Sequence, residues 1–423
     1  MNALNFVIGY DDIKTELYRI RDVLLHLEKY ERFGVIMPTG MLFYGEAGMG
    51  KSLMASCFIA ELDCPVFQLH KEQSGYDAAD EIRQAFAQAK ETKGLAVVFL
   101  DNLDETGAEV YGVLRACMDE AVGSSILVIA TAKDKDDLPD FLLHAGRIDK
   151  VYELETPEPP QIEKMIRVLL PAKKFTEEVD VAEIALILAG SSCAEVKDVV
   201  SEAGVYVVTE GRKRITQQDL LRACLRRRIF KEQESVVESD AVKLRRNAVH
   251  EAGHAVTAEL QEPGSVCLVS VGSYAGGHYG VTSVRTAEGC GETKQLMEKH
   301  IRGLLAGKAA TEIVLGLADT GCADDLRKAF QAVATMVDDF CIFGFDSFDH
   351  PEASEALRGK RDCRITMLME KYYDETKNLL KENLSFLERM VSALLEKRTL
   401  RKRDIKEIRE KYDRKRLKAS DTM

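Results

Sequence analysis

The segment GEAGMGKS, at residues 45–52, constrains the possible fold of this chain more than any other stretch. It matches G-x-x-x-x-G-K-[ST], in which glycines let backbone N–H groups surround phosphates. Lys51 can reach the outer phosphates, and the Ser52 hydroxyl can bind Mg²⁺. A helix that starts near Lys51 directs its positive dipole end at the anion. The segment therefore predicts a site for ATP and Mg²⁺.

Short apolar strands surround this loop. Residues 41–44 precede it, and the runs 95–100 and 126–131 are apolar apart from Thr131 at the end of the second. Apolar strands separated by helices predict a parallel sheet that is covered on both faces. The run 95–100 leads into Asp101, a carboxylate placed to hold Mg²⁺. The predicted nucleotide-binding residues are therefore Gly45, Glu46, Ala47, Gly48, Met49, Gly50, Lys51, Ser52, Leu53 and Asp101.

A second motif, HEAGH at residues 250–254, predicts a metal centre. On a helix, His250 and His254 lie one turn apart on one face and can hold one Zn²⁺. Glu251 projects beside them and can act as the general base of a zinc-dependent peptidase. A catalytic zinc needs a third protein ligand, which spacing alone does not identify. The open alternatives are His278, His300, Glu312, Asp319, Asp324 and Asp325.

The chain of 423 residues is too long for one compact core, and its pattern changes along its length. Prolines at 157, 159 and 160 end the α/β pattern, and helical segments follow up to a polar stretch at 231–240. Strands are expected at 266–271 and 280–284 within an otherwise helical region. The expected domains are an α/β nucleotide-binding domain at 1–156, a helical domain at 157–232, a mainly helical zinc domain at 240–412 and a basic C-terminal tail at 413–423.

Composition limits the cellular setting. The ten cysteines occur singly, without a C-x-x-C pair, which favours a reducing, cytoplasmic location. No run approaches the roughly 18 apolar residues of a membrane span, and the N-terminus lacks the features of a signal peptide. A soluble protein without a membrane-spanning segment is expected. The net charge of -12 argues against nucleic acid as the main partner.

Together these motifs resemble one family over nearly the whole chain, the FtsH-type AAA+ ATP-dependent zinc metalloproteases. The segments that carry the resemblance are, in order, FVIGYDDIK, GEAGMGKS, VVFLDNLDE, HAGRIDK, SSCAEVKDVVSEA, VHEAGHAV, AGGHYGVTSV, LLAGKAATEIVLG and DTGCADDLRKA. The resemblance implies a P-loop AAA+ module with a helical lid, followed by a mainly α-helical zinc metallopeptidase domain with a small β element. It also implies Zn²⁺, ATP and Mg²⁺ as cofactors, polypeptide substrates and a homo-hexamer.

Individual residues carry over from the family's motifs. The family's third zinc ligand is the Asp of a G-A-x-N-D segment that reads GCADD here, so the resemblance implies Asp325 as the ligand. Arg147 in GRIDK matches a finger that acts on the nucleotide of a neighbouring subunit, whereas Lys150 replaces a second Arg. The AGGHYGVTSV segment matches an edge strand that pairs with extended substrate. Glu312 lies near a family pair of acidic residues. A role behind the zinc ligands and a solvent-facing position both stay open for it.

The departures from the family lie in the ATPase region. Asn102 replaces the Glu that activates water, and Asn cannot take a proton. Asp104 and Glu105 are close enough in sequence to substitute for it, although nothing in the spacing favours this. Lys133 stands about where the family has a sensor Asn, and Tyr76 is the nearest match to a substrate-translocating aromatic residue. Because the chain opens with the ATPase module, we expect it to lack the family's N-terminal membrane segments.

Three functions follow from this comparison of motifs. The first is an ATP-dependent zinc metalloendopeptidase that degrades polypeptides. The second is a zinc peptidase whose AAA module binds ATP for assembly or gating with little hydrolysis, as Asn102 suggests. The third is a non-catalytic, chaperone-like scaffold, against which the intact HEAGH motif and Asp325 weigh.

Overall fold

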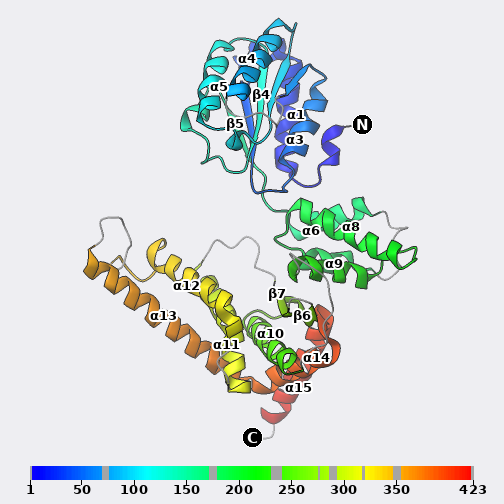
Figure 1. The fold of residues 1–423 in the computed structure, drawn as a ribbon, viewed down its shortest axis with the longest axis vertical. Coiled ribbons are helices and arrows are strands. Elements are labelled where there is room, and N and C mark those ends of the chain that lie inside the picture. Colours follow the sequence, from blue (N-terminus) through cyan, green and yellow to red (C-terminus); the bar gives the residue numbers. More distant parts are fainter. Residues whose placement is uncertain are drawn as a thin grey trace. The chain divides into compact units, whose positions relative to one another are not determined.

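The computed structural model describes residues 2–68, 76–170, 179–229, 241–274, 277–284, 293–316, 320–345 and 354–420 (Figure 1). The chain separates into two compact units, Met1–Ala223 and Cys224–Met423. Among the described helices, none combines the length and the apolar character that a membrane crossing requires.

A five-stranded parallel sheet forms the centre of the first unit. Its order is β2-β3-β4-β1-β5, with β1 at Gly40–Tyr44, β2 at Val66–Gln68, β3 at Ala96–Leu100, β4 at Ile126–Ala132 and β5 at Lys150–Glu153. The predictions for β1, β3 and β4 are confirmed, because these three central strands are buried along nearly their whole length. The two edge strands, β2 and β5, are short and partly exposed. Their sequences lack the continuous apolar run that indicates a buried strand.

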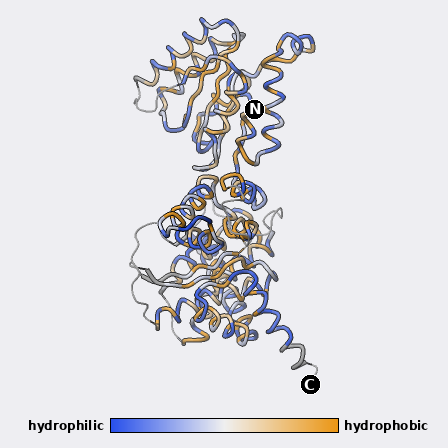
Figure 2. The backbone as a smooth tube through the Cα atoms, turned by 90° about the vertical axis from the view of Figure 1, so that its right-hand side faces the viewer, coloured by the Kyte–Doolittle hydropathy of each residue, from blue (hydrophilic) through white to orange (hydrophobic). Residues whose placement is uncertain are grey.

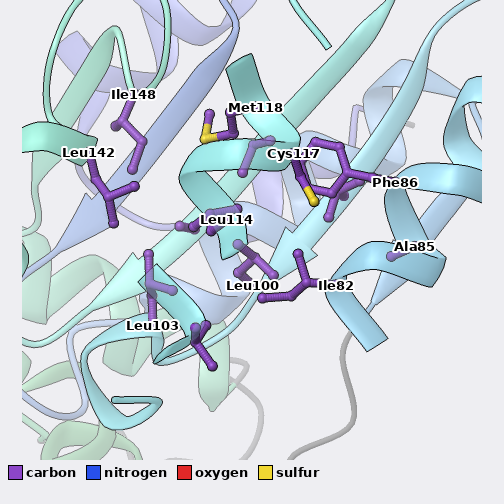
Figure 3. Packing of buried hydrophobic residues seen from close by; sticks show 14 of the residues in the cluster. Ile82, Ala85, Phe86, Leu100, Leu103, Leu114, Cys117, Met118, Leu142 and Ile148 are labelled. Carbon is purple, nitrogen blue, oxygen red and sulfur yellow. The ribbon is translucent and has the colours of Figure 1, made fainter. Parts of the chain in front are cut away.

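Two apolar cores lie on opposite faces of this sheet. Along β3, Val98 and Leu100 pack with α4 (Tyr76–Glu91) and α5 (Ala108–Glu120), whereas Val97 and Phe99 pack with α1 (Asp11–Leu25) and α3 (Lys51–Leu62). Figure 3 shows the first core, where Ile82, Phe86 and Leu114 gather around Leu100. Successive residues of a strand point to opposite faces, which is why a strand covered on both sides must be apolar throughout. The predicted α/β class is confirmed.

Four described helices follow the sheet along the chain: α6 at Pro159–Leu169, α7 at Val181–Ile187, α8 at Cys193–Thr209 and α9 at Gln217–Ile229, within which the first unit ends. Pro159 and Pro160 occupy the first turn of α6, where a missing N–H costs no hydrogen bond. Ser192 and Glu195 form a capping box that begins α8. All four helices match the helical segments expected from the sequence.

The second unit combines a small antiparallel sheet with long helices. The sheet has the order β7-β6-β8, with β6 at Val266–Tyr274, β7 at Gly277–Val284 and β8 at Thr399–Arg401. The strands β6 and β7 are longer than expected, because most of the glycine-rich segment SYAGGHYG belongs to them rather than to a loop. The short strand β8 was not predicted, because it lies between two helices and pairs with β6 from far along the chain.

The helix that carries HEAGH, α10 (Ala241–Gln261), ends just before Pro263 and Gly264, as predicted. It packs against β6, α11 (Lys294–Leu315) and α14 (Leu384–Lys397) in an apolar core that includes Val256, Val269 and Met390. A second core joins α11 with α12 (Ala323–Asp338) and α13 (Glu355–Glu382).

The last helix, α15 (Lys402–Ser420), continues without a break through residue 412, where the basic tail was expected to begin. Its Tyr412 stacks on Phe386 with ring centroids 5.0 Å apart. Figure 2 shows much of α15 in the colours of hydrophilic residues, in contrast to the apolar strands of the first unit. The helix α15 is therefore attached to the core of the second unit through Tyr412.

Candidate functional site

Three side chains from two helices converge in the second unit. His250 and His254 lie on α10 and Asp325 lies in the first turn of α12. One Asp325 carboxylate oxygen is 3.2 Å from His250 Nε2 and 3.4 Å from His254 Nε2, and the two Nε2 atoms are 3.0 Å apart. Within the described ranges, this is the one group of His, Cys, Asp or Glu side chains that is placed to share a metal ion.

The charges of the three side chains are coupled. Burial raises the pKa of Asp325, but hydrogen bonds from His250 and His254 outweigh it and hold this pKa below its usual range. Burial lowers the pKa of His254, but the hydrogen bond to Asp325 and the charge of Glu251 raise it overall. Two imidazole nitrogens and a carboxylate oxygen directed at one point favour a positive charge between them, either a proton or a metal cation.

A backbone carbonyl orients one of these ligands. His254 Nδ1 lies 2.7 Å from the carbonyl oxygen of Gly303 on α11. A carbonyl only accepts hydrogen bonds, so Nδ1 carries the hydrogen and Nε2 keeps its lone pair for a metal. This arrangement is the outer support that metal-binding histidines ordinarily have.

Glycines allow α11 to approach the two imidazoles. A Cβ atom on Gly307 would lie 2.6 Å from His250 Nε2 and 2.6 Å from His254 Nε2. On the facing helix, a Cβ atom on Gly253 would lie 2.5 Å from the Ala306 carbonyl oxygen. The close helix packing and the His₂Asp donor set both fit a zinc ion with one open coordination position.

Glu251 lies next to this cluster without being part of it. Glu251 is buried, and its Oε2 atom accepts a hydrogen bond from the Thr282 hydroxyl of β7 at 2.7 Å. Neither Thr282 nor Gly303 and Gly307 was identified from the sequence. Thr282 and Gly307 lie in segments that carry the family resemblance, but the sequence assigned them no role, because their contacts join segments that are distant along the chain.

The other acidic candidates for the third ligand have different partners. Asp324 is largely exposed and pairs with Arg327 at 2.8 Å and Lys328 at 2.7 Å. Glu312 accepts hydrogen bonds from Lys308 on its own helix and from Lys377 on α13, and the Lys308 hydrogen bond chiefly lowers its pKa to about 2. Glu312 therefore joins α11 to α13 and neither supports the histidines nor simply faces solvent.

Of the two histidine candidates and Asp319, the structure describes the side chain of His300 alone. His300 lies on α11, outside the three-residue group. His278 is on β7, but its side chain and the whole of Asp319 lie outside the described residues.

In the first unit, α3 begins at Lys51, as predicted from the P-loop motif. The Ser52 hydroxyl donates to Asp101 Oδ1 at 2.6 Å, so the two predicted Mg²⁺-binding side chains lie together. Thr131, at the end of β4, donates to the same oxygen at 2.7 Å. Lys51 Nζ donates to the Gly45 carbonyl at 2.6 Å. Thr131 was not singled out from the sequence, because it reaches Asp101 only through the pairing of β3 with β4.

The residues after Asp101 are fixed by a local hydrogen-bond network. Asn102 has a left-handed backbone conformation, with φ of 56°, and its Nδ2 donates to Glu105 at 3.2 Å. Asp104 Oδ2 accepts from the Lys133 backbone N–H at 2.9 Å. Its Oδ1 is buried and has no hydrogen-bond partner in the described part of the chain.

The two carboxylates that follow Asn102, Asp104 and Glu105, have different interactions. Burial lowers the pKa of Lys51, and the largest opposing effect is the negative charge of Asp104. Of these two carboxylates, Asp104 is the one whose charge acts on the pKa of Lys51, whereas Glu105 accepts a hydrogen bond from Asn102.

Arg147 is engaged within its own chain. Its guanidinium contacts both oxygens of Asp119 on α5, at 2.8 Å and 3.2 Å. The neighbouring Lys150 pairs with Glu16 at 2.8 Å. A finger that acts on the nucleotide of another subunit would therefore have to exchange Asp119 for phosphate.

Comparisons with known proteins agree with this division into two sites. Residues 41–156 match the ATPase family associated with various cellular activities (AAA), and residues 237–347 match peptidase family M41. The first match contains the P-loop and Asp101, and the second contains all three converging metal-site residues.

Curated relatives align over almost the entire chain. The ATP-dependent zinc metalloprotease FtsH 2 of Symbiobacterium thermophilum is 29% identical over 95% of this chain and 73% of its own length. The ATP-dependent zinc metalloprotease FtsH of Caldicellulosiruptor bescii is 28% identical over 93% of this chain and 70% of its own length. The chain therefore pairs a AAA-family region with a peptidase family M41 region and is FtsH-like across nearly its whole length.

Proposed function

We propose that this protein is an ATP-dependent zinc metalloendopeptidase that degrades polypeptides. The observation that carries the proposal is the convergence of His250, His254 and Asp325 beside the buried carboxylate of Glu251. A Zn²⁺ ion held by these three side chains would supply Lewis acidity toward the scissile carbonyl. Glu251 would take a proton from the attacking water and transfer it to the leaving amine.

The exposed edge of the small sheet supports a polypeptide substrate. β7 lies at the end of the strand order β7-β6-β8, so one of its sides is free of strand pairing within the described sheet. An extended chain can add to such an edge through backbone hydrogen bonds, which do not depend on its sequence. Because β7 also contacts Glu251 through Thr282, a bound strand would lie near the general base.

We infer that the first unit binds ATP with Mg²⁺ and that its hydrolysis drives substrate toward the peptidase site. Support comes from the P-loop geometry and from the joint placement of Ser52 and Asp101. The substitution at Asn102 favours a second possibility, in which bound ATP organises the assembly with little turnover. The intact metal-ligand cluster weighs against a third, a non-catalytic scaffold.

The assembly and domain roles are also proposals. We propose a homo-hexamer, because a trans-acting Arg147 is useful only beside a neighbour's nucleotide. No disulfide joins the nine cysteines that the structure describes, which suits a reducing cytoplasmic setting. The functional domains would be the AAA module at 1–156, the lid at 157–232, the peptidase at 240–412 and a basic tail at 413–423.

Casein degradation by the purified, zinc-loaded protein tests the proposal. Degradation would be compared with ATP, with a non-hydrolysable analogue and without nucleotide. Glu251→Gln serves as the control, since Gln keeps the shape of the side chain but cannot accept the proton. Cleavage with ATP alone supports a working motor, and equal cleavage with the analogue supports the assembly role. Unchanged cleavage by Glu251→Gln contradicts the peptidase assignment.

A further inference from the structure

The wall that faces the Glu251 carboxylate is formed by the edge strand β7. The Thr282 hydroxyl is 2.7 Å from Glu251 Oε2 and 3.2 Å from the Glu251 backbone carbonyl oxygen. A hydroxyl has a single hydrogen, and a carboxylate accepts it more strongly than a carbonyl does. The short contact to Oε2 is therefore the one that restrains the side chain.

A glycine two residues earlier makes room for the same carboxylate. A Cβ atom on Gly280 would lie 2.3 Å from Glu251 Oε1 and 2.7 Å from its carboxyl carbon. Gly280 does not have a positive φ, so space is the reason for glycine here and not backbone conformation. Gly280 and Thr282 share one face of the strand, because side chains two residues apart point the same way.

We propose that Thr282 is a positioning residue that holds Glu251 in the orientation needed for proton transfer, with Gly280 admitting the carboxylate. This inference rests on the proposed peptidase function. Glu251 is only 8% exposed, so water cannot readily replace a lost hydrogen bond and the carboxylate would turn away from its working position. Thr282 pairs with Val269 of β6, so the register of the sheet sets the position of the hydroxyl.

This arrangement connects substrate binding to the general base. The strand that offers its free edge to an extended polypeptide is the strand that holds Glu251. A substrate backbone added to β7 would restrict the motion of Thr282 and so of the carboxylate. Thr282 acts through Glu251 and need not touch the substrate, so its loss should affect kcat more than KM.

The test compares Thr282→Val, which keeps the shape and removes the hydroxyl, with Thr282→Ser, which keeps the hydroxyl. Both would be made in the full chain, loaded with zinc and assayed on an unfolded fluorescent polypeptide with ATP. We expect Thr282→Val to lower kcat by about 10- to 100-fold with little change in KM, and Thr282→Ser to retain most of the activity. Zinc content should equal that of the parent in both variants.

Thr376→Val is the matched control, because this buried hydroxyl donates to the Tyr372 carbonyl within α13, a helix that carries none of the site residues. Gly280→Ala gives a second measurement, with an expected loss of kcat at full zinc content. If Thr282→Val keeps the parent's kcat, or if Thr282→Ser loses as much as Thr282→Val, the positioning role is wrong. A zinc-loaded parent that cleaves nothing contradicts the proposed function as well, so the two failures are distinguishable.

Discussion

The buried carboxylate of Glu259, near the end of the HEAGH helix, lies 3.6 Å from the guanidinium of Arg409 on the last helix. Glu259 also accepts hydrogen bonds from the backbone N–H groups of Gly264 at 2.9 Å and Val266 at 3.1 Å. One side chain therefore holds the turn between α10 and β6 and attaches α15 to both. Through Arg409, α15 therefore supports the metal-bearing helix.

Arg409→Met should accordingly destabilise the second unit. Glu259 is 1% exposed and would lose its charged partner while keeping two backbone donors. We expect the free energy of unfolding to fall by about 1–3 kcal/mol, measured by denaturant titration of the full chain. Lys406→Met on the exposed face of the same helix is the control, with an expected change within about 0.5 kcal/mol. Equal effects of the two substitutions would refute a specific role for the Glu259 contact.

Asp325 and Asp324 provide a matched pair for the metal centre. Asp325→Asn should weaken zinc binding by about 100-fold or more, because it removes the charged oxygen donor from the His₂Asp set. Asp324→Asn should leave zinc binding unchanged, because this side chain is exposed and pairs with Arg327 and Lys328. Zinc content after dialysis against a graded chelator series measures both. Retention of zinc by Asp325→Asn would show that Asp325 is not a zinc ligand.

The pH dependence of stability should reverse when zinc is removed. In the metal-free protein, the raised pKa of His254 stabilises the fold below its ordinary 6.5, and this contribution is lost as pH rises through the folded pKa. The lowered pKa of Asp325 stabilises the fold at pH values above the ordinary pKa of 3.8. This contribution is lost as the pH falls through the folded pKa of Asp325. Both pKa shifts describe the same interaction between His254 and Asp325. Its contribution to stability is fully present between pH 3.8 and pH 6.5.

Thermal unfolding across pH tests this expectation. The metal-free chain should gain stability from the site at mildly acidic pH, whereas zinc should stabilise most above the raised pKa of His254, where it no longer competes with protons for the histidines. His254→Ala should abolish the difference between the two profiles. Profiles that are parallel with and without zinc would contradict the proposed ligand set.

Restoring a carboxylate after Asp101 tests what limits ATP turnover. Asn102→Glu should raise the rate by about 100-fold if a general base is what the site lacks. The rate of phosphate release at saturating ATP measures it, with Asn102→Gln as a control that adds length without a base. An unchanged rate would indicate that Lys133 or Arg147, and not a missing general base, limits ATP turnover.

Asp104 is the carboxylate to test for any residual turnover. Its negative charge raises the pKa of Lys51 against the effect of burial, and its Oδ1 has no hydrogen-bond partner among the described residues. Asp104→Asn should lower the basal ATPase rate by about 10-fold or more, whereas Glu105→Gln should have little effect because Glu105 is held by Asn102. Nucleotide affinity, measured separately, distinguishes a loss of binding from a loss of turnover. Equal rates for the two variants would exclude a special role for Asp104.

Local pattern was sufficient for much of this protein. The glycines and Lys51 of the P-loop, the apolar runs of β1, β3 and β4 and the helical spacing of His250 and His254 are properties of short continuous segments. Each depends on interactions within a few residues, such as helix periodicity or the burial of a strand on both faces. The sequence by itself therefore determined the α/β class, the nucleotide loop and two of the three metal-site residues.

Tertiary structure decided what depends on distant segments. Spacing left six candidates for the third ligand, among which the family resemblance implied Asp325. The packing of α10 on α11, and of α11 on α12, brings Asp325 to the histidines. The same packing explains Gly303 and Gly307, and the pairing of β7 with β6 places Thr282 against Glu251. Such contacts join residues far apart along the chain, and their distances follow from how whole elements pack together. A linear pattern carries the chemistry of each side chain, but only the folded chain determines which side chains meet.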